Sequence, residues 1–524
     1  MNKQMPTKRA TRRIAASIAI VFALATTGAW AASRYWTGAE DTIWDNTGNW
    51  ENGYIPGNDE VHFRNDKFDS KFTSENGSVI TFTNSFAVWR TRLRGAGSEL
   101  APLVFRATDS NYGLDFGTSV GIIVADSSGS GYLRIESGTY PSSAGIRIGE
   151  NATYYGQLTV TGGAVLKATN GNLDIQNGKV VLDNGTIEIS KTGNSVSLSK
   201  VANGCELHLE SGGVLTTSLI WDGNQGKTST VLFNGGTLKA NGVFSSSWPA
   251  IIADKQNISV NVGAKGGTID ASGFDIQVAR PIEPDGSSTG GMMFKGGGSV
   301  TLTEQPTYTG DTTVEVGTTL VVPSAIAGDK LAFAIPEGVA DGVYEVVRIS
   351  GEGTFAEDVV DHASRPSDEN ARFFLNSAKT RIYCCYGELD GDGKVWVGIA
   401  GDGKLSTAEN WLGNTVPANG DVLNFSMANT AVSLDADLGE VVPATILFGT
   451  KPVTIANGKL TVNTLTNANT LAVGAGASLE VDGDIVAKPS TWGGEAHFLY
   501  SNEGSVIVHG NAVGIATGTA SVYE

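Results

Sequence analysis

The sequence predicts an all-β protein in which short parallel strands coil around one shared core, the architecture of a parallel β-helix. Glycine accounts for 68 of the 524 residues and only 17% of residues are charged, so the chain turns often and carries little charge. Long stretches alternate Val, Ile, Leu and Thr with Gly, Asn and Ser, whereas helical apolar spacing is rare. A glycine-anchored phrase also recurs along the chain. A helical bundle, a doubly wound nucleotide-binding fold and a disordered acidic chain are largely excluded.

Residues 1–31 have the pattern of a secretory signal peptide. Residues 1–13 are basic, residues 14–28 are apolar, and Ala29-Trp30-Ala31 places small residues where an A-x-A cleavage site needs them. The apolar stretch is shorter than the roughly 20 residues of a membrane-spanning helix, and no second apolar stretch follows. We expect a secreted or cell-surface protein that retains no transmembrane segment after cleavage.

The charge and the cysteines exclude some partners and cofactors. Residues 1–31 carry five basic residues and no acidic one, so removing them changes the net charge from −18 to −23. Nucleic acid is therefore not expected as a partner. Cys205, Cys384 and Cys385 show neither CxxC nor Cys/His metal spacing. No metal, no cofactor and no disulfide framework is predicted.

Residues 32–97 are predicted to form an N-terminal cap that opens with a tryptophan motif. Trp36, Asn49, Trp50, Pro56 and Phe63 recur as Trp396, Asn410, Trp411, Pro417 and Phe425, at offsets of 360 to 362 residues. The motif opens a unit each time, and the end coil of a solenoid exposes apolar surface that a differently built cover must protect.

Residues 98–325 are predicted to form the main β-helix. The recurring phrase is anchored on Gly138, Gly163, Gly185, Gly213, Gly236 and Gly267. The intervals between these glycines range from 22 residues (Gly163 to Gly185) to 31 residues (Gly236 to Gly267). Each unit holds two or three strands of about four residues and buries its apolar face only by stacking on its neighbours. A blade propeller is the less favoured all-β alternative, because the aromatic signatures of its repeats are absent.

Residues 294–323 resemble the autotransporter-associated β-strand repeat of exported bacterial surface proteins. The residues that carry the likeness are Gly298, Val300, Leu302, Thr307-Tyr308-Thr309-Gly310, Thr312-Thr313-Val314, Gly317 and Leu320. The resemblance implies a right-handed parallel β-helix, a pectin-lyase-like solenoid, displayed outside the cell as an adhesin, matrix or scaffold. Members that export themselves end in a membrane β-barrel, and no such segment precedes Glu524. Secretion by another route and an incomplete reading frame both stay open.

The last two segments differ in character. Residues 326–392 contain longer alternating strands separated by a polar stretch, which indicates a small antiparallel β domain or cap that closes the first solenoid. Residues 393–524 begin with the second tryptophan motif and restart the rhythm of strands and glycines. They are predicted to be a second cap and the start of a second β-solenoid.

Trp36, Trp44 and Trp50 are the first candidate ligand-binding residues, because indole rings can stack on sugar rings. The alternative is that they pack in the cap, where large aromatic side chains dominate the core. The second motif has Leu405 where the first has Trp44. Leucine can replace tryptophan in a core but offers no ring face, so packing is favoured.

Arg90, Arg92 and Arg94 are the second set of candidates. Strict alternation on a strand places them on one face. Such a ridge could bind a polyanion such as a uronate glycan, a phosphate or a lipid head group. The favoured alternative is a solvated face on which local carboxylates pair with the arginines.

A non-catalytic adhesin or structural scaffold is the predicted function, with an extracellular glycan or another cell-surface component as the expected partner. The alternative is a glycan-binding or polysaccharide-degrading β-helix, a lyase or hydrolase. Arg134 and Arg147, with Asp174 and Asp183 nearby in sequence, are the residues considered for lyase chemistry. They read as isolated surface residues, and the five histidines form no recognisable triad or ligand cluster. No catalytic residue is predicted.

Overall fold

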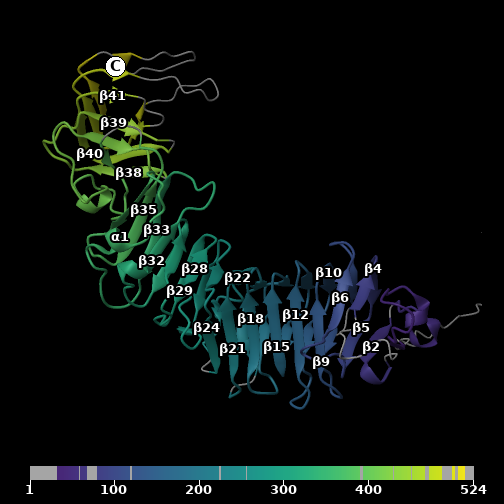
Figure 1. Cartoon of the computed structure of the whole chain (residues 1–524). Coiled ribbons are helices and arrows are strands. Elements are labelled where there is room, and N and C mark those ends of the chain that lie inside the picture. The colour runs from purple at the N-terminus through teal and green to yellow at the C-terminus, as the bar shows by residue number, and fades with distance from the viewer. Residues whose placement is uncertain are drawn as a thin grey trace, which may run out of the picture.

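The chain folds as a long stack of parallel β-coils. The computed structural model describes residues 32–57, 59–67, 79–117, 121–223, 226–254, 257–389, 393–428, 430–449, 451–466, 471–486, 499–501, 505–510 and 512–513. The predicted signal peptide at residues 1–31 lies outside these residues. Figure 1 shows an elongated, curved body along which the strands follow one another from the N-terminal to the C-terminal end. The predicted fold class, an all-β parallel β-helix, is confirmed.

Sheet 1 is the longest wall of the first rod and has 15 strands. In spatial order its strands are β1 (Ser33–Tyr35), β2 (Glu60–Arg64), β5 (Arg90–Arg94), β8 (Ile122–Val124), β11 (Ile146–Ile148), β14 (Leu173–Ile175), β17 (Val196–Leu198), β20 (Ile220–Asp222), β23 (Ala250–Ile252), β26 (Asp275–Val278), β29 (Gly298–Leu302), β31 (Thr318–Val322), β33 (Gly342–Ile349), β35 (Arg381–Tyr386) and β34 (Ala371–Leu375).

Sheets 2 and 3 are the other two walls, with 9 strands each. Sheet 2 contains β3 (Val79–Phe82), β6 (Leu103–Ala107), β9 (Gly131–Ile135), β12 (Gly156–Thr161), β15 (Gly178–Asp183), β18 (Cys205–Glu210), β21 (Ser229–Asn234), β24 (Ile258–Val262) and β27 (Ile282–Pro284). Sheet 3 contains β10 (Thr139–Ser142), β13 (Val165–Ala168), β16 (Thr186–Ile189), β19 (Val214–Thr217), β22 (Thr237–Ala240), β25 (Gly267–Asp270), β28 (Met292–Lys295), β30 (Thr312–Glu315) and β32 (Leu331–Ala334). A separate parallel pair joins β4 (Ser85–Val88) and β7 (Gly113–Phe116).

From β9 to β29 each coil of the rod contributes one strand to each sheet, whereas among the described residues the coils before β9 have no strand in sheet 3 and those after β29 have none in sheet 2. The chain passes from β9 in sheet 2 to β10 in sheet 3 and β11 in sheet 1, and β12 then returns to sheet 2. Because neighbouring strands pair in parallel register, their inward side chains stack in columns. One column contains Leu158, Val180, Leu207, Val231 and Val260, all of them buried. Burial of each such side chain stabilises the fold by about 1.5–3 kcal/mol, so the core is a continuous ladder of apolar contacts.

The recurring glycines mark the corner between sheets 2 and 3. Gly185 and Gly213 directly precede strands of sheet 3 that pair in register. A Cβ atom on Gly213 would lie only 2.1 Å from the carbonyl oxygen of Leu182 in the preceding coil. Gly163 precedes the stacked position by one residue, and Ala164 occupies that position. The corner is therefore a place where the backbones of successive coils approach too closely for most side chains.

The region predicted as the N-terminal cap already belongs to the coil stack. Strands β1, β2 and β5 lie in sheet 1 and β3 lies in sheet 2. One core that extends from Trp36 to Cys384 contains the buried aromatic residues of this region, Trp36, Trp44, Trp50, Phe63 and Phe82. Residues 32–97 therefore close the rod with coils of its own sheets rather than with a separate layer.

The antiparallel segment completes sheet 1 at the other end of the rod. Part of β33 pairs in parallel with β31, and β33 pairs antiparallel with β35, which pairs antiparallel with β34. Strand β32 continues sheet 3 in parallel with β30. Residues 326–392 therefore continue the rod, and their antiparallel strands end the parallel stack of sheet 1, with β34 as its last strand.

A second unit begins at Lys394 with a core of its own, which runs from Trp396 to Ile485. Its strands are β36 (Lys394–Val395), β37 (Val422–Phe425), β38 (Val432–Ala436), β39 (Thr445–Phe448), β40 (Val453–Val462), β41 (Leu465–Thr466), β42 (Leu471–Val473), β43 (Ser478–Val481), β44 (Ile485–Val486), β45 (Leu499–Ser501), β46 (Ser505–Val508) and β47 (Ala512–Val513). In the described residues these strands pair with one another in parallel. A small apolar cluster of Cys385, Val395 and Met427 lies where the two units meet.

Helices are short and few in the described part of the chain. They are α1 (Val359–His362) and the 3-10 turns η1 (Thr47–Asn49), η2 (Glu51–Gly53), η3 (Asn65–Lys67), η4 (Gly328–Lys330) and η5 (Ala408–Asn410). Among the described residues, none of these helices has the length or apolar character that crossing a bilayer requires.

Candidate functional site

The three candidate tryptophans lie inside the core. Trp36 and Trp44 are fully buried and Trp50 is 3% exposed. The ring of Trp50 meets Trp36 and Trp44 edge to face, at centroid distances of 5.0 and 4.7 Å. The indole of Trp50 also donates a hydrogen bond of 2.8 Å to the carbonyl oxygen of Trp44. Sugar stacking requires an exposed ring face, which these three side chains do not have, so the geometry fits the packing interpretation.

A buried asparagine organises the loop beside these rings. Asn49 accepts hydrogen bonds from the backbone amides of Glu40 and Asp41, both 2.9 Å long. Its amide donates to the carbonyl oxygen of Ile43 at 2.9 Å and to the carboxylate of Asp41 at 2.6 Å. The side chain is fully buried, so one amide group satisfies four polar atoms of the loop.

The second unit repeats this arrangement. Asn410 accepts a hydrogen bond from the backbone amide of Ala400 at 3.1 Å and donates to the carbonyl oxygen of Lys404 at 2.9 Å and to the carboxylate of Asp402 at 2.7 Å. Trp411 donates 2.8 Å to the carbonyl oxygen of Leu405, in the same way as its counterpart in the first unit. The duplication found in the sequence is therefore a duplicated structure. The recurrence of the Asn-Trp pair was visible in the sequence, but the role of the amide was not.

The candidate arginines project from the outer face of sheet 1. Arg90, Arg92 and Arg94 alternate on β5 with Thr91 and Leu93, which are fully buried. We call these three arginines the arginine row. Their guanidinium-bearing side chains retain 16 to 26% exposure, so they lie against neighbouring groups rather than extending freely into solvent.

Three carboxylates from other coils engage the arginine row. Glu60 lies 3.6 Å from Arg90 and also accepts a hydrogen bond from Arg92. Asp126, whose side chain is fully buried, lies 3.7 Å from Arg92 and pairs with Arg94. Glu150 Oε2 lies 3.5 Å from Arg92 Nη1. Glu150 also pairs with Arg147, so three carboxylates engage four guanidinium groups, and a polyanion would have to displace partly buried ion pairs to bind here.

His62 adds no positive charge to this surface near neutral pH. It lies beside Arg92 in the register of β2 and β5, is 3% exposed and stacks on Tyr35 at a centroid distance of 5.0 Å. Burial lowers the pKa of His62 to about 4. The nearby carboxylate of Glu60 opposes this shift, whereas Arg94 and Arg92 reinforce it. The imidazole is therefore a neutral part of the packed face.

The four residues considered for lyase chemistry lie on two different walls. Arg147 and Asp174 are register partners on β11 and β14 of sheet 1. Arg147 donates a 3.0 Å hydrogen bond to Glu150, and burial raises the pKa of Asp174 while Arg147 opposes that shift. Arg134 and Asp183 lie instead on β9 and β15 of sheet 2. The four residues therefore lie on two separate sheets, two on each, rather than in one group.

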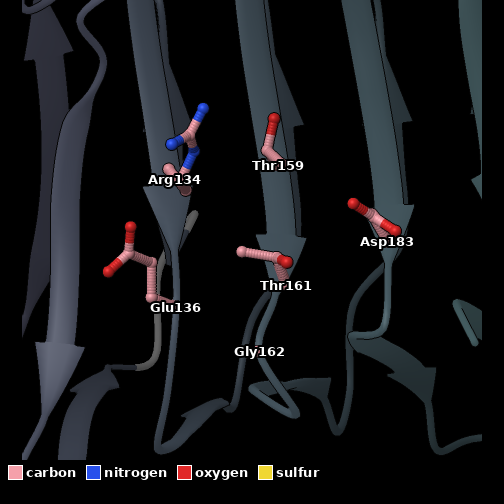
Figure 2. A pocket seen from close by; sticks show the side chains of 6 residues that line it. All are labelled: Arg134, Glu136, Thr159, Thr161, Gly162 and Asp183. Atoms are coloured by element: carbon pink, nitrogen blue, oxygen red, sulfur yellow. The ribbon is translucent and has the colours of Figure 1, made fainter.

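A depression of about 530 Å³ lies on the outer face of sheet 2. Its lining residues are Arg134, Glu136, Thr159, Thr161, Gly162 and Asp183. Figure 2 shows these residues along three neighbouring strands: Arg134 lies on β9 with Glu136 just beyond its end, the two threonines lie on β12, and Asp183 lies on β15. The sequence singled out Arg134 and Asp183 among four residues considered for lyase chemistry, but it did not show that these two share a depression with Thr159 and Thr161, because they are two coils apart along the chain.

Two other groups of reactive side chains are already engaged or buried. Glu480, Asp482 and His509 place ligand atoms within 4.8 Å of one another, but Lys459 and His509 both pair with Glu480. These hydrogen bonds lower the pKa of the Glu480 carboxyl group. Burial raises the pKa of Cys384 to about 12 and that of Cys385 to about 11. Neither thiol is therefore a ready nucleophile at neutral pH.

No protein-family model, no curated protein and no solved structure matches this chain.

Proposed function

We propose that this chain is an exported bacterial β-helix protein that acts outside the cell as an adhesin or structural scaffold and is not a catalyst. The observation that carries the proposal is the uninterrupted coil stack, in which one apolar core runs from Trp36 to Cys384. Such a stack is a stiff, elongated object whose outer faces repeat the same strand positions along its length. A protein built in this way is suited to span distance and to present surfaces.

The export part of the proposal depends on residues 1–31. Their basic, apolar and small-residue regions follow the order of a signal peptide. The likeness of residues 294–323 to the autotransporter-associated repeat supports the same destination, and we propose membership of that group of exported passengers. The net charge of −23 after cleavage also suits a protein that stays soluble at a crowded surface.

The scaffold role is also supported by how the outer charged groups are used. In sheet 1 the arginine row is neutralised by carboxylates of other coils. In sheet 3, Lys167 pairs with Glu188 across neighbouring coils at 3.3 Å. Pairs of this kind stabilise the stacking of one coil on the next and leave few charged groups poised for chemistry.

The competing proposal is a polysaccharide lyase or hydrolase. One observation favours it enough to keep it as an alternative, namely the raised pKa of Asp174 beside Arg147. A carboxyl group of raised pKa next to a guanidinium could serve as an acid or base toward an anionic sugar.

The test has an export arm and a catalysis arm. The chain is expressed in a bacterium with its own leader and with Leu24→Arg, which interrupts the apolar stretch. We expect the parent chain outside the cytoplasm with Ala32 as its first residue, and we expect the variant to stay in the cytoplasm uncleaved. An uncleaved parent chain in the cytoplasm would refute export.

For catalysis, the exported chain is incubated with a panel of uronate-rich and neutral polysaccharides. We expect no release of unsaturated or reducing ends. Release of sugar ends by the parent chain that disappears in Asp174→Asn would establish the competing function. Replacement of the arginine row by serine would then show whether that face binds the substrate.

A further inference from the structure

Polar side chains without partners gather in the depression on sheet 2. In the described part of the chain, Arg134 forms no ion pair, and its Nε is buried without a hydrogen-bond acceptor. Thr159, Thr161 and Asp183 form no side-chain hydrogen bond to any described residue. The register brings them together, because Arg134 lies opposite Thr159 and Thr161 lies opposite Asp183. Desolvation of Arg134 is thus only partly compensated within the chain.

The other charged residues on this face pair with one another. On the N-terminal side Arg106 donates to Glu136, which itself lines the depression, at 2.9 and 2.5 Å. On the C-terminal side Glu206 pairs with Lys179 at 3.2 Å and with His208 at 2.9 Å. The fold therefore saturates the charges on either side and leaves Arg134 and Asp183 available between them.

The shape of the depression depends on a glycine. Gly162 follows β12 with a φ of +61°, and a Cβ atom there would lie 2.1 Å from the carbonyl oxygen of Glu136. The turn therefore passes close to the neighbouring coil without adding a side chain that would fill the space.

The composition of the depression indicates the chemistry of its ligand. Arg134 offers N–H donors, Asp183 offers acceptors, and each threonine hydroxyl can do both. The charges of Arg134 and Asp183 cancel, and those of Arg106 and Glu136 cancel within their ion pair. A ligand that carries many hydroxyl groups and no net charge matches this set, because each hydroxyl donates one hydrogen bond and accepts others. A uronate or a phosphate would meet the carboxylates of Asp183 and Glu136, and no apolar anchor suited to a protein partner lines the depression.

Aromatic surface lies close to this group on the same strand. Tyr132 is two positions before Arg134 on β9 and shares its outward face. Its ring lies 6.2 Å from that of Tyr155, and both side chains are half-buried. Ring faces beside hydroxyl-binding groups suit the apolar and polar sides of a pyranose ring.

We infer that the depression formed by Arg134, Thr159, Thr161 and Asp183 binds a neutral glycan. Arg134 donates to ring or hydroxyl oxygens, and Asp183 accepts from sugar hydroxyls. The inference deepens the proposed adhesin role by naming a site and a ligand class, and it requires no catalytic step.

The experiment titrates the purified full chain with neutral tetrasaccharides of glucose, mannose, galactose and xylose, and with tetragalacturonate as the anionic probe. Ligand-observed NMR detects weak binding. Arg134→Gln and Asp183→Asn remove one charge each and keep the outward position. Lys239→Gln, an exposed change on sheet 3, is the matched control. We expect at least one neutral tetrasaccharide to saturate a single site, with about tenfold weaker binding in both test variants and no change in the control.

A second measurement guards against misfolded variants. Carbodiimide labelling of Asp183 in the unaltered chain, followed by mass spectrometry, should slow when the neutral tetrasaccharide is present. The inference is overturned if no neutral tetrasaccharide binds, if only tetragalacturonate binds, or if both variants bind as the parent does. Absence of binding would refute the glycan site but not the proposed exported scaffold. A cytoplasmic, uncleaved chain would refute export but not the glycan site.

Discussion

Replacement of Asn49 by alanine should loosen the first tryptophan unit while the rest of the rod stays intact. The substitution removes the buried amide that joins Glu40, Asp41 and Ile43. Three of its hydrogen bonds involve backbone groups and the fourth involves the carboxylate of Asp41. The same loop supports Trp44, so its disorder would reach the aromatic core.

The magnitude follows from the number of hydrogen bonds and from their exposure. A typical intramolecular hydrogen bond contributes about 0.5–1.5 kcal/mol, and one to a charged group contributes about 1.5–3 kcal/mol. Glu40 and Asp41 are exposed, so water can replace the amide at their backbone groups and recover part of the loss. We expect Asn49→Ala to lower the free energy of unfolding of this unit by about 2–3 kcal/mol.

Local readouts are needed because a long repeat array need not unfold in one step. Hydrogen exchange of residues 36–64 and 396–425 separates the two tryptophan units. Asn49→Ala should speed exchange in the first range alone, and Asn410→Ala, at the duplicated position, should speed exchange in the second range alone. Thr47→Ala changes an exposed neighbour that donates no side-chain hydrogen bond in the described chain and is the control.

Exchange of residues 36–64 in Asn49→Ala that stays within the range of Thr47→Ala would refute the stabilising role of Asn49. Equal acceleration of exchange in both units by a substitution in one of them would also contradict it, because the two cores are separate.

Three further outcomes are expected. Leu207→Ala, inside the core column, should lower the local free energy of unfolding, measured by hydrogen exchange of its own coil, by about 2–5 kcal/mol. Val181→Ala, which faces outward on the neighbouring strand, should change it little, and equal effects would contradict the column. The pKa of His62 is about 4 in the folded chain and about 6.5 in the unfolded chain. The folded state should therefore lose up to ~3 kcal/mol of stability as the pH falls from about 6.5 to about 4. His62→Gln should reduce the difference between the urea midpoints measured at these two pH values. Cys384 and Cys385, with pKa values raised to about 12 and about 11, should react with a thiol reagent at neutral pH only after denaturant is added, and rapid labelling of the native chain would contradict their burial.

Local features made the coil architecture predictable. Strict alternation sets which residues face inward, as on β12, where Leu158 and Val160 are buried while Gln157 and Thr159 are not. Tight corners select glycine, as at Gly213, where a Cβ atom would meet the preceding coil. Both signals lie within a few residues of sequence, so they can be recognised without knowing which residues are in contact in the folded chain.

The sites were less accessible to the same reasoning. The alternation around Arg92 predicted a shared face, but Glu60 and Glu150, which approach it, lie in other coils. Asp183 reaches the neighbourhood of Arg134 only because two coil lengths place their strands in the same sheet.

The sequence by itself determined that this chain is all β, that its coils stack with glycine corners and that a tryptophan unit occurs twice, because these properties depend on short-range periodicity and backbone sterics. Only the tertiary structure decided that Trp44 is core rather than a binding platform, that carboxylates neutralise the arginine row, and that Arg134 and Asp183 share a depression. The reason is that coil lengths vary along the chain, so the positions that stack upon one another are set by the register of the folded coils.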